Sequence, residues 1–152
     1  MRVGVAADQS GLVLKDSVLD WLREQKHLTV DYGAHPDCPA DDFLHHALAM
    51  AWAVSRGTVE RGILFSESGI GGAIVANKIR GVRAGFTHDP ESLRHATAYN
   101  HMNVFSLWSA GLELGGAIDL LRVFLSCPYV DDAATRRRLA RIAALVNRFS
   151  FA

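Results

Sequence analysis

Five short and mostly apolar runs recur along the chain, separated by longer stretches in which apolar residues return at helical spacing. The apolar runs occupy residues 2–7, 28–32, 62–65, 82–86 and 104–108. Runs of this length and composition are typical of strands that are buried on both faces of a parallel sheet. The pattern therefore predicts five strands, the first of which ends just before Asp8.

The stretches between the strands predict helices. Between residues 12 and 25, one helical face would carry Leu14, Val18, Leu19, Trp21 and Leu22. Comparable spacing predicts further helices over residues 41–55, 73–78, 90–99, 114–125 and 136–148. We expect Asp41 or Asp42 to cap the second helix and Asp131 with Asp132 to cap the last, while Gly57 ends the second.

Strands and helices alternate along the whole chain, and neither an internal repeat nor an interior linker interrupts them. Alternation of this kind is typical of an α/β fold with a parallel sheet and right-handed crossovers. Residues 1–152 are therefore expected to form a single domain. In such sheets a ligand binds beyond the carboxyl ends of the strands, so functional side chains are expected on the loops that follow the strands.

Composition narrows the classes of function. Hydrophobic residues make up 49% of the 152 residues and charged residues 21%, which argues against disorder. Lys and Arg number 16, as do Asp and Glu, so the formal net charge is zero and nucleic-acid binding is disfavoured. The mean hydropathy is +0.10, and a neutral, slightly apolar chain favours an oligomer that buries part of its surface.

The two cysteines, Cys38 and Cys127, match no metal-binding or redox spacing, so free thiols in a reducing compartment are expected. No run of 18 or more apolar residues occurs that would predict a membrane span. No signal peptide is recognised, because the first residues lead directly into the first strand. The expected location is therefore cytoplasmic.

A glycine-rich turn, residues 68–72 (SGIGG), directly follows the third strand and opens the next helix. Glycines let the backbone approach an anion, and the unpaired N–H groups at a helix start point towards it. Ile74 stands where the dinucleotide fingerprint needs glycine, and no Walker A sequence occurs, so NAD, FAD and ATP are disfavoured. A small anionic or polyhydroxy ligand fits better; the alternative is a tight strand-to-helix turn without a ligand.

Several motifs together resemble one family of enzymes. The most specific is the run over residues 61–84, which contains the glycine-rich turn and then Ala76, Asn77 and Lys78. The match extends to residues 8–15 (DQSGLVLK), His88 with Asp89, residues 100–104 (NHMNV) and residues 111–114 (GLEL). Over nearly its whole length, the sequence resembles the ribose-5-phosphate isomerase B and galactose-6-phosphate isomerase family.

This resemblance implies a three-layer, flavodoxin-like or Rossmann-like fold around a five-stranded parallel sheet. It implies aldose–ketose isomerisation of a sugar phosphate through an enediol, with neither a metal nor a cofactor. It also implies a homodimer or a dimer of dimers whose sites are shared across the subunit interface. Substrate-binding residues would then include Asp8, Gln9, Ser68, Gly69, Gly71, Gly72, Asn100 and Arg138.

The sequence departs from this family where the catalytic groups are expected. The family's proton-abstracting base is either a cysteine, where Ser66 stands here, or a glutamate, where Gly72 stands. The ring-opening histidine corresponds to Tyr99, and the histidine after the first aspartate corresponds to Gln9. A serine hydroxyl is too weakly acidic to act as a base without an activating partner. Another residue is therefore needed as the base.

Most of the family's phosphate-binding residues are also absent from this sequence. The family's C-terminal Arg-His pair aligns with Ala134 and Thr135, and only the later arginine, Arg138, is kept. Another family arginine falls near Ala110, in a stretch that is shorter here. Arg138 would reach across a dimer to an anionic substrate, or it would belong to a solvated basic helix face together with Arg136, Arg137 and Arg141.

Enolisation needs a base near the carbon between two oxygens and a donor for the developing oxyanion. Glu67 is the one carboxylate on the glycine-rich turn, at a position where the family usually has glycine. Burial beside the sheet would make it a stronger base. We therefore expect Glu67 to replace the missing base, with Ser66 or Ser68 holding a hydroxyl. The alternative is a solvent-facing glutamate on a turn.

Three further residues each have a functional and a structural interpretation. Asp8 would contact a sugar hydroxyl, or it would cap a helix. Tyr99 would hydrogen-bond the ring oxygen or O1 of the substrate, although a phenol is a poor base at neutral pH, or it would pack at a dimer interface. Asn100 would bind an oxyanion or a hydroxyl, or it would form a turn.

The histidines do not indicate a metal centre. His45 and His46 are adjacent, whereas a helical metal pair is four residues apart, and no other histidine shows metal-ligand spacing. One of the two is expected to line the mouth of the pocket and the other to face solvent. No metal site is therefore expected.

Three hypotheses about function remain open. The first is a sugar-phosphate isomerase with a rearranged active site. The second is a non-catalytic relative that binds a sugar phosphate or pairs with an active, paralogous subunit. The third is an isomerase of a non-phosphorylated sugar, because the phosphate-binding arginines are few. The retained glycine-rich turn, Asp8 and Asn100 indicate a ligand, and Glu67 favours the first hypothesis.

Overall fold

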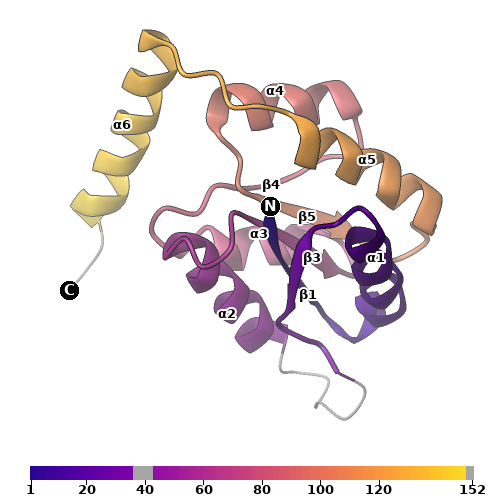
Figure 1. Ribbon diagram of the computed structural model, residues 1–152. Helices are drawn as coiled ribbons and strands as arrows, with labels where there is room; N and C mark the ends of the chain where they lie inside the picture. Colours follow the sequence, from indigo (N-terminus) through magenta and orange to yellow (C-terminus); the bar gives the residue numbers. More distant parts are fainter. Residues whose placement is uncertain (36–42, 150–152) are drawn as a thin grey trace.

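One parallel sheet organises the molecule (Figure 1). The computed structural model describes residues 1–35 and 43–149. The sheet has five strands in the order β2-β1-β3-β5-β4. They are β1 (Arg2–Ala7), β2 (Leu28–Asp31), β3 (Arg61–Ser66), β4 (Ala84–Phe86) and β5 (Val104–Trp108). The predicted five-stranded parallel sheet is thus confirmed.

Helices cover both faces of this sheet (Figure 1). They are α1 (Leu12–Glu24), α2 (Phe43–Ser55), α3 (Ile70–Ala76), α4 (Pro90–Asn100), α5 (Leu114–Ser126) and α6 (Ala133–Phe149). α1, α4 and α5 pack on one face, and α2 and α3 pack on the other. Neighbouring residues of β3 illustrate the two cores, since Phe65 lies in the first and Leu64 in the second. This alternation gives the expected three layers.

The order of the strands fixes where a ligand would bind. From β1 the chain moves to the edge strand β2 and then crosses back over β1 to form β3. Such a reversal leaves a crevice beyond the carboxyl ends of the two strands on either side of it. Asp8 follows β1 directly and Ser66 is the last residue of β3, so both lie at this crevice.

Two predicted boundaries are wrong, the start of the helix after the glycine-rich turn and the start of the fourth strand. α3 begins at Ile70, not at Ala73, because Gly69 already turns the backbone with a positive φ of 73°. β4 begins at Ala84, not at Val82, because the N–H of Val82 is bonded to the carbonyl of Ile79 in a turn. The early start of α3 brings Gly71 and Gly72 into its first turn.

α6 stands apart from the two helical layers (Figure 1). It begins at Ala133, earlier than residue 136, because the Asp132 carboxylate accepts the N–H of Thr135 at 2.7 Å and so caps the helix as predicted. Gly57 follows α2 with a φ of 71°, as expected of a helix-ending glycine. The caps predicted at Asp41 or Asp42, and Cys38, fall outside the described residues. Within those residues, no helix has the length and apolarity to cross a membrane.

Candidate active site

Backbone hydrogen bonds tie together the carboxyl ends of the three central strands. The N–H of Asp8, after β1, donates to the carbonyl of Phe65 in β3 at 2.9 Å. The N–H of Ser109, after β5, donates to the carbonyl of Ser66 at 2.9 Å. Because these bonds continue the sheet beyond its regular strands, Asp8, Ser66, Glu67 and Ser109 lie close together at its carboxyl edge. With residues 68–72 they form what we call the glycine-loop cluster.

Asp8 holds this cluster in place. Its Oδ1 accepts the N–H of Gly11 at 2.9 Å and the hydroxyl of Ser10 at 2.6 Å. Its Oδ2 accepts the N–H of Glu67 at 2.8 Å. The helix-capping interpretation of Asp8 is therefore confirmed, since the acceptance from Gly11 caps the short 3₁₀ turn Gln9–Gly11. The bond to Glu67 adds a role that the sequence did not reveal, because it joins residues 59 positions apart.

Glu67 is exposed in the single chain. Its backbone is fixed by Asp8, whereas none of the hydrogen bonds and ion pairs among residues 1–35 and 43–149 involves its carboxylate. The burial expected to strengthen this base is therefore absent from one chain alone. A carboxylate that is free of internal partners on a fixed backbone remains available to a ligand.

Two serines of the turn differ in their surroundings. Ser66 is buried, and in the described part of the chain its hydroxyl has no hydrogen-bond partner. An unpaired buried hydroxyl is costly, so it is expected to serve a ligand or a water molecule. Ser68 is exposed, and its hydroxyl accepts the N–H of Ile70 at 3.3 Å, which helps to start α3.

Tight packing fixes the glycine-rich turn. A Cβ on Gly69 would lie 2.6 Å from the ring of Phe86 and 2.8 Å from the backbone N of Trp108. A Cβ on Gly72 would lie 2.7 Å from the hydroxyl of Ser106, which donates to the carbonyl of Gly69 at 2.5 Å. A glutamate at position 72, as in part of the resembled family, would therefore displace Ser106. A Cβ on Gly71 would meet nothing within 4 Å, so this glycine faces open space.

Three aromatic rings form a wall beside Gly69. The ring centroids of Phe86, His88 and Trp108 lie 6.0 to 6.2 Å apart, and each pair meets edge to face. Phe86 and Trp108 end neighbouring strands, so both reach the carboxyl edge of the sheet. This aromatic wall is not among the residues that the sequence predicts for the site. The signal was an aromatic residue at the end of each of two predicted strands.

The other predicted site residues form a second group, the α4–α6 cluster of Tyr99, Asn100 and Arg138. One guanidinium nitrogen of Arg138 donates to the carbonyl of Tyr99 at 3.0 Å and to the Oδ1 of Asn100 at 3.4 Å. The Tyr99 side chain is 39% exposed, and its ring tilts against that of His95 at 4.9 Å. The turn-forming alternative for Asn100 does not hold, because Asn100 is the last residue of α4.

The structure does not bring the two clusters together in one chain. α4 begins after the carboxyl end of β4 and runs back to the amino end of β5, so Tyr99 and Asn100 lie at the opposite edge of the sheet from Glu67. The 11 residues of α4 correspond to a rise of about 16 Å. A single chain therefore presents two separate sets of candidate residues.

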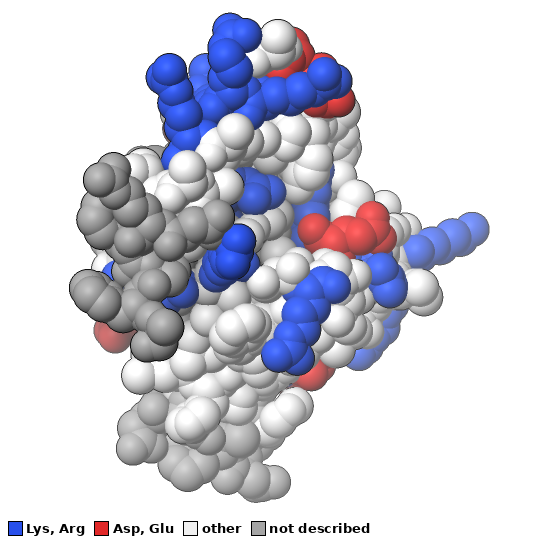
Figure 2. Space-filling model, turned by 90° about the vertical axis from the view of Figure 1, so that its left-hand side faces the viewer, with Lys and Arg blue, Asp and Glu red and all other residues white. Residues whose placement is uncertain are grey.

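Arginines gather around the α4–α6 cluster. Figure 2 shows Lys and Arg concentrated on the face that carries α6. A groove of about 350 Å³ on this face is lined by Arg137, Arg138 and Arg141 together with the apolar Ile142 and Leu145. Arg136 is not free, because it forms an ion pair with Asp131 at 2.6 Å, and this raises the pKa of its guanidinium. The groove is suited to an anion.

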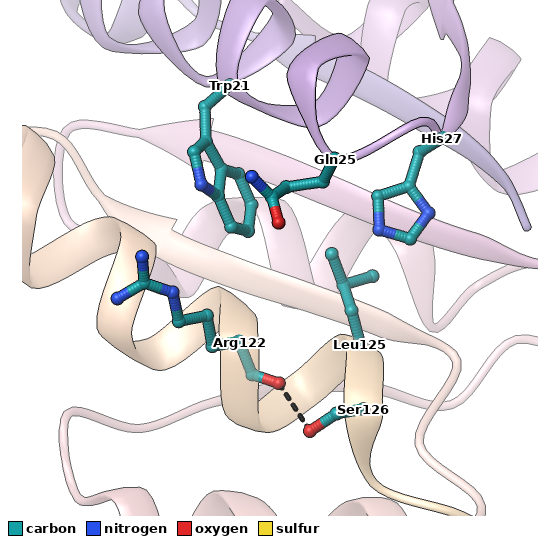
Figure 3. Close-up of a pocket in the computed structure, with 6 residues that line it drawn as sticks. All are labelled: Trp21, Gln25, His27, Arg122, Leu125 and Ser126. Carbon is teal, nitrogen blue, oxygen red and sulfur yellow. Dashed lines mark hydrogen bonds between the residues drawn. The ribbon is translucent and has the colours of Figure 1, made fainter.

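A different groove, of about 250 Å³, lies at the amino edge of the sheet, between the ends of α1 and α5 (Figure 3). It is lined by Trp21, Gln25, His27, Arg122, Leu125 and Ser126. Burial, and then the charge of the N-terminal amino group, lower the pKa of His27. None of the predicted site residues lies here. In the part of the chain that the structure describes, the Nε1 of Trp21 and the Nδ1 of His27 are buried and have no hydrogen-bond partner. This groove is therefore not the candidate active site.

His45, His46 and Gln9 lie around the carboxyl edge. The Nδ1 of His46 is 2.8 Å from the carbonyl of Tyr32, and its ring packs against Gly33, whereas His45 is exposed. The side chain of Gln9 donates to the carbonyl of His35 at 3.4 Å. Among the described residues, no three His, Cys, Asp or Glu side chains are grouped so as to hold a metal ion.

Comparisons with known proteins identify similar sequences and folds. A family model described as Ribose/Galactose Isomerase matches residues 3–142. A D-erythrulose-4-phosphate isomerase of Pectobacterium atrosepticum is 37% identical over 108 residues, which are 70% of this chain and 70% of that protein. The ribose-5-phosphate isomerase B of Escherichia coli is 30% identical over 149 residues, which are 97% of each chain.

Solved structures show the same architecture. A ribose-5-phosphate isomerase B of Clostridium thermocellum is similar with a TM-score of 0.92 and 27% identity, over 99% of this chain and 100% of that chain. A ribose-5-phosphate isomerase B of Mycoplasma genitalium with bound ribulose-5-phosphate is similar with a TM-score of 0.88 and 25% identity, over 96% of each chain. The flavodoxin-like or Rossmann-like fold implied by the resemblance is thus confirmed.

Proposed function

The chain belongs to the ribose/galactose isomerase family, a family of sugar phosphate isomerases, and on that premise we propose that it interconverts an aldose phosphate and its ketose isomer through an enediol with Glu67 as the base. The observation that carries this proposal is the state of Glu67 in the glycine-loop cluster. Asp8 fixes the backbone of Glu67, and its carboxylate has no partner in the described part of the chain. The proposed chemistry needs neither a metal nor a cofactor.

In this mechanism Glu67 removes the proton from the carbon next to the carbonyl and returns it to the neighbouring carbon. The buried hydroxyl of Ser66 lies one residue away and has no partner among residues 1–35 and 43–149, so it would donate to the oxyanion that develops on the substrate. Binding of the substrate beneath a partner chain would exclude water and supply the burial that Glu67 lacks in the single chain.

The phosphate would be held by groups from two chains. The first turn of α3 presents N–H groups at Gly71 and Gly72, beside open space at Gly71. Arg138 and Asn100 lie at the opposite edge of their own sheet, so they would reach this site only from a partner chain. We infer a homodimer, or a dimer of dimers, in which each site pairs the glycine-loop cluster of one chain with the α4–α6 cluster of the other.

One observation favours a second candidate function. A protein named galactose-6-phosphate isomerase subunit LacA 2, from Streptococcus pyogenes, is 29% identical over 129 residues. A protein named as a subunit suggests that this chain could pair with a paralogous partner. In that case the chain would bind a sugar phosphate and complete the partner's site, and its own Glu67 would not be needed.

The test is hydrogen exchange in D₂O. The purified protein would be incubated with tetrose, pentose and hexose phosphates and with the matching free sugars. NMR would follow deuterium at C2 of the aldose or C1 of the ketose. We expect exchange with at least one phosphorylated sugar, and a loss of about 10²–10⁴-fold in Glu67→Gln. Glu113→Gln, an exposed glutamate before α5, is the matched control and is expected to retain the wild-type rate.

The outcomes separate the candidates. Unchanged exchange in a folded Glu67→Gln variant would contradict the role of Glu67 as the base. No exchange with any sugar, together with saturable binding of a sugar phosphate, would replace the isomerase proposal with the non-catalytic partner. Exchange with free sugars alone would point to a non-phosphorylated substrate.

A further inference from the structure

Three oxygen-bearing side chains form a continuous hydrogen-bonded chain across the carboxyl edge of the sheet. The Oγ of Ser10 lies 2.6 Å from the Oδ1 of Asp8 and 2.6 Å from the Oγ of Ser109. Asp8 follows β1 and Ser109 follows β5, while β3 lies between these two strands. The chain of oxygens therefore passes over the end of β3, where Ser66 and Glu67 lie.

The direction of these hydrogen bonds follows from the number of protons. A carboxylate only accepts, so the single hydroxyl proton of Ser10 is donated to Asp8. Ser10 has no second proton, so the short contact with Ser109 requires Ser109 to donate to Ser10. The hydroxyl proton of Ser109 is thereby committed as well. What Ser109 retains is the ability to accept a hydrogen bond from a further hydroxyl.

The position of Ser109 makes a substrate hydroxyl the natural donor. Its backbone N–H is bonded to the carbonyl of Ser66, the residue just before Glu67. Its side chain is half-buried, whereas that of Ser10 is exposed. The Asp8 oxygens already take three internal donors, two on Oδ1 and one on Oδ2. A substrate hydroxyl would therefore be bound through Ser109 more readily than by Asp8 itself.

We propose that Ser109, Ser10 and Asp8 form a proton relay that deprotonates a substrate hydroxyl as its oxygen becomes the carbonyl of the ketose. This proposal rests on the isomerase function proposed above. It assigns Ser109 as the group that contacts the substrate, and Ser10 and Asp8 as positioning residues that act through it. It also gives Asp8, predicted to bind a sugar hydroxyl, an indirect route to that hydroxyl.

The step balances in protons and electrons. In the enediol, the O–H bond at C2 breaks and its electron pair forms the C2=O bond. The electron pair of the C1=C2 double bond takes up, at C1, the proton that Glu67 carries. The proton from the C2 hydroxyl passes to Ser109 as Ser109 passes its own to Ser10 and Ser10 passes its own to Asp8. Asp8 then releases a proton to water, which supplied the proton on O1 in the first half of the reaction.

The relay makes a prediction that a purely structural role would not make. Removal of the C2 proton by Glu67 belongs to the first half of the reaction, and transfer through Ser10 belongs to the second. In Ser10→Ala, D₂O should therefore still exchange into the recovered aldose while ketose formation falls by about 10²-fold. The ratio of exchange to conversion is thus expected to rise by about the same factor, with little change in KM.

Matched variants control this experiment. Ser10→Thr keeps the hydroxyl and is expected to keep the wild-type ratio, and Ser109→Ala is expected to raise it as Ser10→Ala does. Ser17→Ala removes a hydroxyl that donates within α1, to the carbonyl of Val13 at 3.0 Å, and should change neither rate. Thermal unfolding of each variant would verify that the fold is retained.

The failure of the relay can be told from the failure of the proposed function. Wild-type protein that neither exchanges nor converts any sugar phosphate would overturn both. Wild-type protein that isomerises, with Ser10→Ala and Ser109→Ala slowing exchange and conversion equally or not at all, would overturn the relay alone.

Discussion

The glycine-loop cluster and the α4–α6 cluster are built in opposite ways. The first lies at the ends of buried strands, and the carboxylate of Asp8 alone accepts three hydrogen bonds there. The second depends on a long exposed side chain, Arg138, from a helix that stands apart from the sheet (Figure 1). The sheet positions the proposed chemistry firmly, whereas the proposed phosphate contact lies where a second chain can meet it.

α6 also carries exposed apolar side chains. Ile142 and Leu145 are exposed, although their helix packs beside the segment around Arg83. Apolar residues next to arginines on a projecting helix suit contact with a partner chain. The two clusters therefore differ in what completes them: folding completes the first, and association would complete the second.

The largest effect is expected when the two substitutions, Glu67→Gln and Arg138→Ala, are placed on different chains of one dimer. Each variant alone would be nearly inactive at substrate concentrations below KM. Refolded together as random dimers, they would regain about a quarter of the wild-type kcat/KM, because half of the dimers are mixed and each mixed dimer has one intact site. Steady-state assays before and after mixing would measure this gain.

A mixture that stays as inactive as its components would mean that the two residues act in the same chain or do not share a site. The control is a mixture of Glu67→Gln chains with chains that carry both substitutions, which has no intact site in any pairing. It should show no gain.

A single added methyl group should destabilise the glycine-loop cluster. Gly69→Ala places a Cβ against Phe86 and the backbone of Trp108 and forces an alanine to a φ of 73°, so the free energy of unfolding should fall by about 2–4 kcal/mol. Gly71→Ala is the matched control, because its Cβ meets no atom within 4 Å. Urea denaturation would compare them, and equal stability of the two variants would show that packing does not fix the turn.

A smaller effect, on KM, is expected from a substitution in the α4–α6 cluster. Arg138→Ala should raise KM for a phosphorylated substrate by about ten- to a hundredfold, the size of a lost charge-assisted hydrogen bond, and leave the fold unchanged. Arg136→Ala should alter KM much less, because Arg136 is already paired with Asp131 at the surface. Steady-state kinetics would test both variants, and equal increases in KM would assign the effect to general charge.

The smallest expected effect is a dependence of α6 on pH. The N–H of Thr135 holds the pKa of the Asp132 carboxyl below its ordinary value of 3.8. The folded form thus keeps the carboxylate longer than the unfolded form as the pH falls. The resulting stabilisation is complete well above 3.8 and is lost as the pH falls below it, through the lowered pKa. The protection of amides in the first turn of α6, measured against their intrinsic exchange rates at each pH, should fall in that range, and less so in Asp132→Asn, whose cap carries no titrating group.

Much of the fold could be predicted because its signals are local. β1 and β3 are buried on both faces, so their apolar runs were easy to recognise. The beginning of α3 was misplaced because Ile70, Gly71 and Gly72 read as a loop, while the turn at Gly69 is enforced by Phe86 and Trp108 from other strands. Contacts from distant strands of this kind have no local signature.

The candidate site was predicted residue by residue but not as an arrangement. Glu67 and Asp8 were each singled out, whereas the bond between them depends on the pairing of β1 with β3. Tyr99 and Asn100 were predicted at the same site, whereas Arg138 was expected to reach it across a dimer or to lie on a solvated helix face. The direction of α4 shows that all three lie at the other edge of the sheet. The aromatic wall could not be predicted for the same reason, since Phe86 and Trp108 meet only when β4 and β5 pair.

The sequence by itself determined the parallel α/β architecture, the family and the inventory of candidate groups, because hydrophobic period and contiguous motifs are written in neighbouring residues. Only the tertiary structure decided that Ser10 meets Ser109 and that Arg138 bonds to the end of α4, at the opposite edge of the sheet from the glycine-rich turn. It also decided that Asp8 holds the backbone of Glu67, whose carboxylate has no partner within the described residues. The reason is physical. Strand order and helix direction bring together or separate residues up to 99 positions apart, and these follow from how the whole chain buries its apolar surface.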